Sequence, residues 1–118
     1  MPKKPSYYGN LFKFEGTVIE IHSVNEVTLR IDLGFNVQTL QKAVLIGVGQ
    51  PLVDVDRVRT WIRQTVHQRK CYLETVRIWQ GKSVHTGVMV FYVDKGSDDQ
   101  LVCLNSKMIE LGLVEGVK

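Results

Sequence analysis

The stretch from Gly16 to Pro51 constrains the fold of this chain most, because its pattern predicts short strands separated by turns. Residues 17–21 (TVIEI) and 26–31 (EVTLRI) carry β-branched residues in partial alternation, which is typical of strands with one buried face. The Ser-Val-Asn break at 23–25 predicts a tight turn, since Asn tolerates a positive φ and Ser bonds to its own backbone. The folded part of the chain is therefore expected to begin with a β-meander.

The third strand of this meander is predicted over residues 42–48 (KAVLIGV). A reversal at 33–36 (LGFN) and a looser connection up to Gln41 are expected before it. The strand is expected to end at Gly49-Gln50-Pro51. The rest of the chain is then expected to cover the meander.

The hydrophobic period changes after Pro51 and predicts a helix of roughly four turns. Its apolar stripe consists of Val58, Trp61, Ile62 and Val66. Acids precede the stripe at 54 and 56 and cations follow it at 69–70, as the helix dipole favours. The residues that fall mostly away from the stripe include Arg57, Arg59 and Arg63. A solvated helix face explains these arginines, and a nucleic-acid footprint is the alternative that the pattern favours less.

A hairpin is predicted next, from strands at 71–79 (CYLETVRIW) and 85–93 (HTGVMVFYV) joined by a turn at 80–83. Gly87 lies inside the second strand and predicts a bulge or a bend, the kind of feature with which small barrels turn a corner.

A short strand at 100–103 is expected to lead into a helix at 106–111. Asn105 is expected to cap this helix and Gly112 to end it. The last six residues, 113–118, are too few for a further element of substance.

These elements predict a mainly β fold, a five-stranded OB-fold Greek-key barrel with a helix between strands 3 and 4 and a short C-terminal helix. A barrel also covers the edges that short strands would otherwise leave open. Residues 13–118 are expected to form this single domain, because a chain of 118 residues can bury a core without disulfides. Residues 1–12 are expected to form a basic and aromatic N-terminal arm.

Charge and composition narrow the possible partners and compartment. Lys and Arg number 15 against 12 acids, so the net charge of +3 permits a phosphate-rich partner without requiring one. No apolar stretch reaches the length of a signal peptide or a membrane span, which predicts a cytoplasmic protein without a membrane partner. Cys71 and Cys103 form no C-x-x-C pair and are expected to be buried free thiols, without structural zinc.

The N-terminal arm has two interpretations. It carries Lys3, Lys4, Tyr7 and Tyr8, with prolines at 2 and 5 that block a helix. Such an arm can follow a nucleic-acid backbone or stack on a base. The pattern favours the other interpretation, a partly disordered tail whose tyrosines lean on the domain.

Four segments resemble the staphylococcal nuclease-like (thermonuclease) domains. Residues 17–29 align without gaps with the opening strand, turn and strand of that family, and residues 44–51 look like the strand that carries its Asp-Thr-Pro. The turn at 32–35 (DLGF) is similar to versions found among phage-encoded members, and residues 104–113 look like the last core helix. The resemblance covers about residues 16 to 114. It implies an OB-fold barrel, a calcium-assisted nuclease ancestry and a phage origin, with the host cytoplasm as the compartment.

The catalytic residues of that family are replaced in this chain. The resemblance places Asn25 at a metal-binding Asp, Gly49 at a second metal carboxylate and Leu52 at the general base. It places Val44 and Thr86 at the two arginines that hold the phosphate. Calcium-assisted cleavage needs these carboxylates and cations. The resemblance therefore implies no metal, no cofactor, no catalytic residue and no enzymatic activity.

Three functions remain open from the sequence. The first is a catalytically inactive module that binds DNA or RNA without sequence specificity, with candidate contacts Lys3, Lys4, Tyr7, Tyr8, Arg30, Lys42, Arg77 and Lys82. The second is a protein-interaction module, for example a viral protein that docks on a host or phage protein. The third, which the pattern favours least, is a divergent metal-dependent nuclease with relocated ligands. The histidines at 22, 67 and 85 are expected to be surface or half-buried residues rather than ligands.

Overall fold

The β-meander and the later hairpin close into one barrel. The computed structural model describes residues 12–80, 83–94 and 100–117. The barrel strands are β1 (Phe12–Ile21), β2 (Glu26–Gly34), β3 (Val37–Leu45), β5 (Lys70–Gln80) and β6 (Ser83–Asp94). They are paired in the order β3-β2-β1-β5-β6 through antiparallel ladders, and β3 then pairs with β6 in parallel. This is the strand order of a five-stranded OB-type Greek-key barrel, and the predicted fold class is confirmed.

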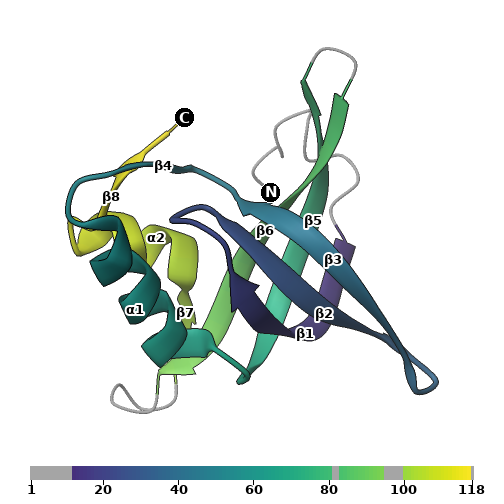
Figure 1. Ribbon diagram of the computed structural model, residues 1–118. Coiled ribbons are helices and arrows are strands. Elements are labelled where there is room, and N and C mark those ends of the chain that lie inside the picture. The colour runs from purple at the N-terminus through teal and green to yellow at the C-terminus, as the bar shows by residue number, and fades with distance from the viewer. Residues whose placement is uncertain (1–11, 81–82, 95–99, 118) are drawn as a thin grey trace, which may run out of the picture.

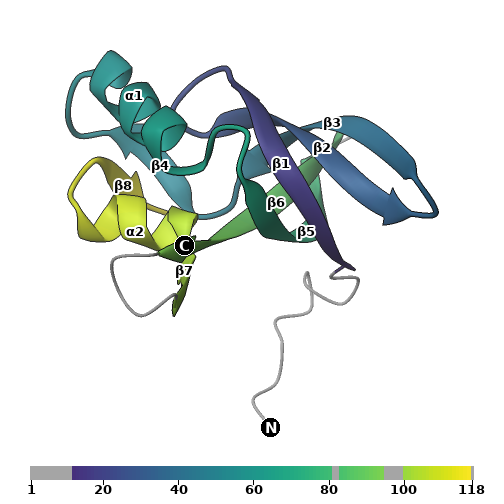
Figure 2. The same ribbon diagram turned by 90° about the horizontal axis from the view of Figure 1, so that it is seen from below.

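The remaining elements gather at one end of the barrel (Figures 1 and 2). They are α1 (Val55–Val66), α2 (Leu104–Glu110), and a small ribbon made of β4 (Val48–Pro51) and β8 (Val114–Gly116). Another strand, β7 (Gln100–Cys103), extends the sheet beside β6. In both views the β2–β3 hairpin projects away from the helices. The molecule therefore has a helical end and a projecting hairpin end.

The core lies between the inner face of the barrel and the two helices. On β2, Val27, Leu29 and Ile31 are buried while their neighbours are half-buried or exposed, which is the alternation that the sequence predicts. On α1, the buried residues are Val58, Ile62 and Val66, so the predicted helical stripe is confirmed. Leu104 and Met108 of α2 are fully buried against the same core. The two helices thus close one end of the barrel.

Helix α1 is shorter than predicted at its C-terminal end. Its N-terminus is capped by Asp54, whose carboxylate accepts the backbone N–H of Asp56 at 2.8 Å. The helix ends at Val66 rather than near Lys70, because Gln68 has a positive φ of 59° and its N–H donates to the carbonyl of Val18 at 2.9 Å. This turn brings the end of α1 onto β1, and it ends the helix before Arg69 and Lys70, which were expected in its last turn.

The predicted third strand and its connection are wrong in detail. Strand β3 begins at Val37, directly after the two-residue turn Phe35-Asn36, so no loose connection to Gln41 exists. At its other end β3 stops at Leu45, and Gly47 takes a φ of 79°. The chain then leaves the barrel as β4, which pairs with β8. The last residues, expected to form no element, supply this partner strand.

Two further local features differ from the prediction. Of the bulge or bend predicted at Gly87, the bulge is absent, because β5 and β6 keep one register through it. A Cβ there would lie 2.6 Å from Ile78 Cδ1 and 2.9 Å from Ile46 Cγ1, so glycine allows close packing where β3 meets β6. Asn105 does not cap α2, whose N-cap is Cys103 without a side-chain bond. Asn105 is instead buried inside the first turn and bonds to the barrel.

The two thiols differ in their environment. Cys71 is fully buried in β5, and burial raises the pKa of its thiol to about 11, against a smaller lowering by Arg69. Cys103 is half-buried. The thiolate is the form that reacts with disulfide reagents. At about pH 8, roughly one Cys71 thiol in a thousand is ionised.

We therefore expect a disulfide reagent to modify Cys103 rapidly in the native protein and Cys71 only as the protein unfolds. The measurement is the number of thiols that react with and without denaturant. The control is Cys103→Ser, which should remove the fast phase. Two thiols that react at one rate in the native state would contradict the expectation.

Candidate nucleic-acid interface

Three of the five positions that the resemblance aligned with nuclease residues lie close together in the barrel. Asn25 is half-buried just before β2, and its carbonyl accepts the N–H of Leu45 at 2.7 Å. Its side chain accepts a bond from Ser23 Oγ at 3.1 Å. Val44 of β3 pairs with Gly87 of β6, directly beside Thr86. The structure thus brings Asn25, Val44 and Thr86 onto neighbouring strands, and none of them carries a charge.

The other two replaced positions belong to the β4–β8 ribbon. A Cβ on Gly49 would lie 2.5 Å from Val117 Cγ2, so glycine is needed for β4 to pack on the end of the chain. Leu52 donates its N–H to the carbonyl of Leu113 at 2.9 Å and has an exposed side chain. Within residues 12–80, 83–94 and 100–117, no three His, Cys, Asp or Glu side chains gather so that they could hold a metal ion.

The predicted nucleic-acid contacts divide into three groups. Lys3, Lys4, Tyr7, Tyr8 and Lys82 lie outside the described residues. Arg77 is exposed on β5 and pairs with Thr86 of β6, so β6 separates it from β3. Arg30 and Lys42 lie together on β2 and β3.

Arg30 and Lys42 share the outer face of the β2–β3 hairpin. The ladder pairs Thr28 with Lys42 and Arg30 with Leu40, so the two cations are diagonal neighbours. Both side chains are exposed, because the alternate residues of β2 fill the core. Neither cation takes part in an ion pair or a side-chain hydrogen bond with the residues that the structure describes. This face of strands 2 and 3 is the one with which OB folds bind oligonucleotides.

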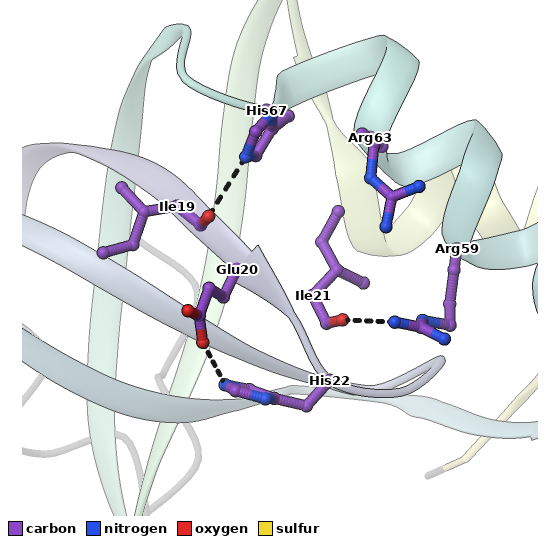
Figure 3. A pocket seen from close by; sticks show the side chains of 7 residues that line it. All are labelled: Ile19, Glu20, Ile21, His22, Arg59, Arg63 and His67. Atoms are coloured by element: carbon purple, nitrogen blue, oxygen red, sulfur yellow. Dashed lines mark hydrogen bonds and ion pairs between the residues drawn. The ribbon is translucent and has the colours of Figure 1, made fainter.

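A polar pocket lies beside this face, between α1 and the end of β1 (Figure 3). Its volume is about 380 Å³. Its lining consists of Ile19, Glu20, Ile21, His22, Arg59, Arg63 and His67. We call it the α1–β1 pocket.

The helix places its basic residues in the pocket by simple spacing. Arg59 and Arg63 lie four residues apart and therefore on one side of α1, and His67 follows as the C-cap of the helix. Each follows directly after a buried residue of α1, which puts all three at the margin where the helix meets β1. On the other side, the register between β1 and β2 shifts between Val18 and Glu20, next to the β1 residues that line the pocket.

Two of these residues are tied to backbone carbonyls of β1. Arg59 donates from Nη2 to the carbonyl of Ile21 at 3.1 Å, and its Nη1 lies 3.8 Å from Asp56 Oδ1. Its Nε is buried and has no hydrogen-bond partner. The ring nitrogen Nε2 of His67 lies 3.0 Å from the carbonyl oxygen of Ile19. The β1 backbone thus holds both side chains at the wall of the pocket.

Arg63 and His22 have different surroundings from these two residues. The guanidinium of Arg63 extends from α1 over the pocket, and no ion pair or hydrogen bond of this side chain occurs among the described residues (Figure 3). His22 Nε2 lies 2.6 Å from Thr28 Oγ1 and 3.6 Å from Glu20 Oε2. Glu20 is the acid among the lining residues.

The pocket and the outer face of the hairpin are continuous. His22 contacts Thr28, and Thr28 pairs with Lys42. A row of arginine, histidine and lysine side chains therefore leads from α1 across β1 to β2 and β3. We call this row the basic track and define it as Arg63, Arg59, His22, Lys42 and Arg30.

Sequence reasoning found only part of the basic track. It selected Arg30 and Lys42, but it assigned Arg59 and Arg63 to a solvated helix face and set His22 aside. The four-residue spacing of Arg59, Arg63 and His67, each next to a buried position, is the signal that would have found the pocket. The contact of this row with β1 could not be inferred from local pattern.

The tip of the β2–β3 hairpin carries a separate feature. Its large apolar side chains are exposed, namely Leu33, Phe35, Val37 and Leu40. Phe35 is 100% exposed and has a φ of 53°. A positive φ is uncommon for a bulky residue and costs energy, and apolar side chains are usually buried. This tip is therefore unusual in both backbone and side chain.

Comparisons of this chain with models of protein families, with curated proteins and with solved structures yield no match. Among the described residues, no helix has both the length and the apolar character that a membrane span requires.

Proposed function

We propose that this chain is a non-catalytic module that binds nucleic acid without sequence preference on the outer face of β2 and β3. The observation that carries the proposal is the basic track, in which Arg30 and Lys42 lie on that face, without an ion-pair partner in the described part of the chain, and lead to the α1–β1 pocket. Cations that contact phosphates provide sequence-independent affinity. The uncharged residues Asn25, Val44 and Thr86 beside the track support a binding role rather than cleavage.

On this proposal the chain is a degenerate staphylococcal nuclease-like domain. The OB-type barrel supports that relation, and so does the loss of charge at the replaced positions. Acids also border the track: Glu20 lines the pocket, Glu26 pairs with Val44, and Asp32 lies two residues after Arg30 on the same face of β2. They favour modest affinity. Binding should therefore depend strongly on salt.

Fluorescence anisotropy with labelled single strands of about 16 nucleotides tests the proposal, since an OB fold covers roughly 4–16 nucleotides. At about 50 mM salt, strands of different sequence are expected to bind with similar affinity and to dissociate as salt is raised. Absence of binding at low salt, or strong dependence on sequence, would overturn the proposal. The same strands incubated with Ca²⁺, Mg²⁺ or Mn²⁺ should stay intact; cleavage that a chelator stops would favour a divergent nuclease.

The exposed hairpin tip favours a second candidate function, protein binding. Among the described residues, positions 37–43 of β3 pair with β2 alone, so their other edge is open to another strand. The apolar side chains at 33, 35, 37 and 40 lie beside this edge. Because every copy presents the same open edge, the partner that we infer is the β3 edge of a second copy.

Phe35→Gly tests this candidate. The left-handed conformation at Phe35 costs a residue with a side chain roughly 1–2 kcal/mol, and glycine removes this cost. Glycine also stabilises the unfolded chain through its greater conformational entropy, by about 0.4–1 kcal/mol, which partly offsets the gain. The variant is therefore expected to be as stable as the parent protein, or more stable, in urea unfolding.

In sedimentation velocity the same variant should associate less than the parent protein. Leu101→Ser, which removes an exposed apolar side chain far from the tip, is the matched control and should associate normally. A parent protein that stays monomeric at high concentration would rule out pairing of two copies.

A further inference from the structure

We propose that the α1–β1 pocket binds a phosphate monoester, the group found at the phosphorylated end of a nucleic-acid strand. The choice of phosphate is argued from the pocket alone. The choice of a strand end as its source rests on the proposed function, because the pocket lies at one end of the basic track. No replaced nuclease position lines this pocket.

The polar groups of the pocket favour an anion. Arg59 and Arg63 bring two permanent positive charges to one space of about 380 Å³. Arg59 Nε is a buried N–H donor with no partner, and a buried donor without a partner is costly. Arg63 has no described partner that would hold it elsewhere, and it extends over the same space (Figure 3). An oxyanion in this space would accept N–H groups of Arg63 directly, and it would balance the positive charge of Arg59 beside it.

Phosphate fits these donors better than a carboxylate does. A guanidinium presents its N–H groups as a planar fork that matches phosphate oxygens in pairs. The two forks come from successive turns of α1, and the rings of His22 and His67 offer further donors when they are protonated. A phosphate offers three or more acceptor oxygens to donors from several directions, whereas a carboxylate offers two.

A monoester suits the charge of the pocket better than a diester. A phosphate monoester carries about −1.5 to −2 charge at pH 7, whereas each internal phosphate of a strand carries one negative charge. Two arginines can balance the larger negative charge of a monoester. The carboxylate of Glu20 also lines the pocket, 3.6 Å from His22, and its negative charge repels a bound phosphate. This carboxylate therefore weakens binding of any anion and provides a second way to test the site.

The first experiment compares strands of one sequence that carry a 5′-phosphate, a 3′-phosphate or hydroxyls at both ends, by anisotropy. We expect one phosphorylated form to bind about tenfold more tightly than the hydroxyl form. The ratio of the two affinities, phosphorylated over hydroxyl form, should fall close to one in Arg63→Gln. Glu20→Gln should raise the affinity for the phosphorylated form. Arg57→Gln is the matched control, because Arg57 is exposed on the same helix outside the pocket. It should leave the ratio unchanged.

Equal binding of all three strands would overturn the inference and leave the proposed function intact. The same holds if Arg57→Gln lowers the ratio as much as Arg63→Gln does. If no strand binds, the proposed function fails, and inorganic phosphate then tests the pocket by itself. Phosphate at matched ionic strength should raise the melting temperature of the parent protein and of Arg57→Gln, but not that of Arg63→Gln. No rise in the parent protein would overturn the pocket as well.

Discussion

Replacement of Asn105 by alanine is expected to lower the free energy of unfolding by about 3–5 kcal/mol, enough to unfold a marginally stable domain. Asn105 is 2% exposed, and its amide makes three bonds to barrel backbone. Its Oδ1 accepts the N–H of Val90 at 3.1 Å, and its Nδ2 donates to the carbonyls of Val88 at 3.0 Å and Ile46 at 2.9 Å.

The position of these bonds explains the size of the effect. Along one edge of β6, β3 pairs at Gly87 and Val88, and β7 pairs from Phe91 onward. The side-chain amide of Asn105 fills the gap between them as a strand would, since it offers both a donor and an acceptor. Alanine would leave the N–H of Val90 and the carbonyl of Ile46 without this partner, whereas the carbonyl of Val88 still accepts the N–H of Ile46 at 3.0 Å. Each buried group left without a partner costs about 1–3 kcal/mol.

Urea unfolding measures this loss, with Ser106→Ala as the control because Ser106 is the exposed neighbour in the same helix. Asn105→Asp keeps an acceptor for Val90 but loses the donor and buries a charge, so it should also be strongly destabilising at neutral pH. A loss below about 1 kcal/mol for Asn105→Ala would mean that water or a shifted β7 replaces the amide.

The double replacement Arg30→Gln with Lys42→Gln is expected to weaken nucleic-acid binding about tenfold at roughly 50 mM salt. It should also reduce the slope of log affinity against log salt by roughly 1.4, because each phosphate contact with a single strand contributes roughly 0.7. Both side chains are exposed and lack described partners, so their loss should leave the fold unchanged. Anisotropy over a salt series measures both quantities.

The control is the double replacement Arg57→Gln with Arg69→Gln. It removes the same net charge from exposed positions that lie outside the basic track. It should change the affinity much less, since the salt-dependent affinity comes from cations that contact phosphates and neither side chain lies on the β2–β3 face. If both pairs weaken binding equally, net charge rather than the β2–β3 face is responsible.

The strands of the meander and the row of apolar residues on α1 were predictable because their signals are local. A period of two in residues 26–31 and a period near 3.6 in residues 58–66 each indicate one buried face, whatever the element packs against. The number and order of such elements then led to the OB-type barrel. The relation to staphylococcal nuclease-like domains stays a prediction, as does nucleic-acid binding.

The features that escaped prediction depend on contacts between distant parts of the chain. Strand β3 ends earlier than predicted because the residues after it form β4, which pairs with β8 at the other end of the chain. Asn105 has the residue type of a helix cap, but the gap on β6 gives it three stronger partners. The α1–β1 pocket needs a helix row and an irregular strand to meet.

The sequence by itself determined which residues of this protein face inward and, through them, the barrel. Hydrophobic burial follows the spacing of side chains along each element, and that spacing is a property of the chain alone. Only the tertiary structure decided which polar side chains converge, because hydrogen bonds and charges act over a few ångströms between residues far apart in sequence. The basic track and the buried amide of Asn105 are both of this second kind.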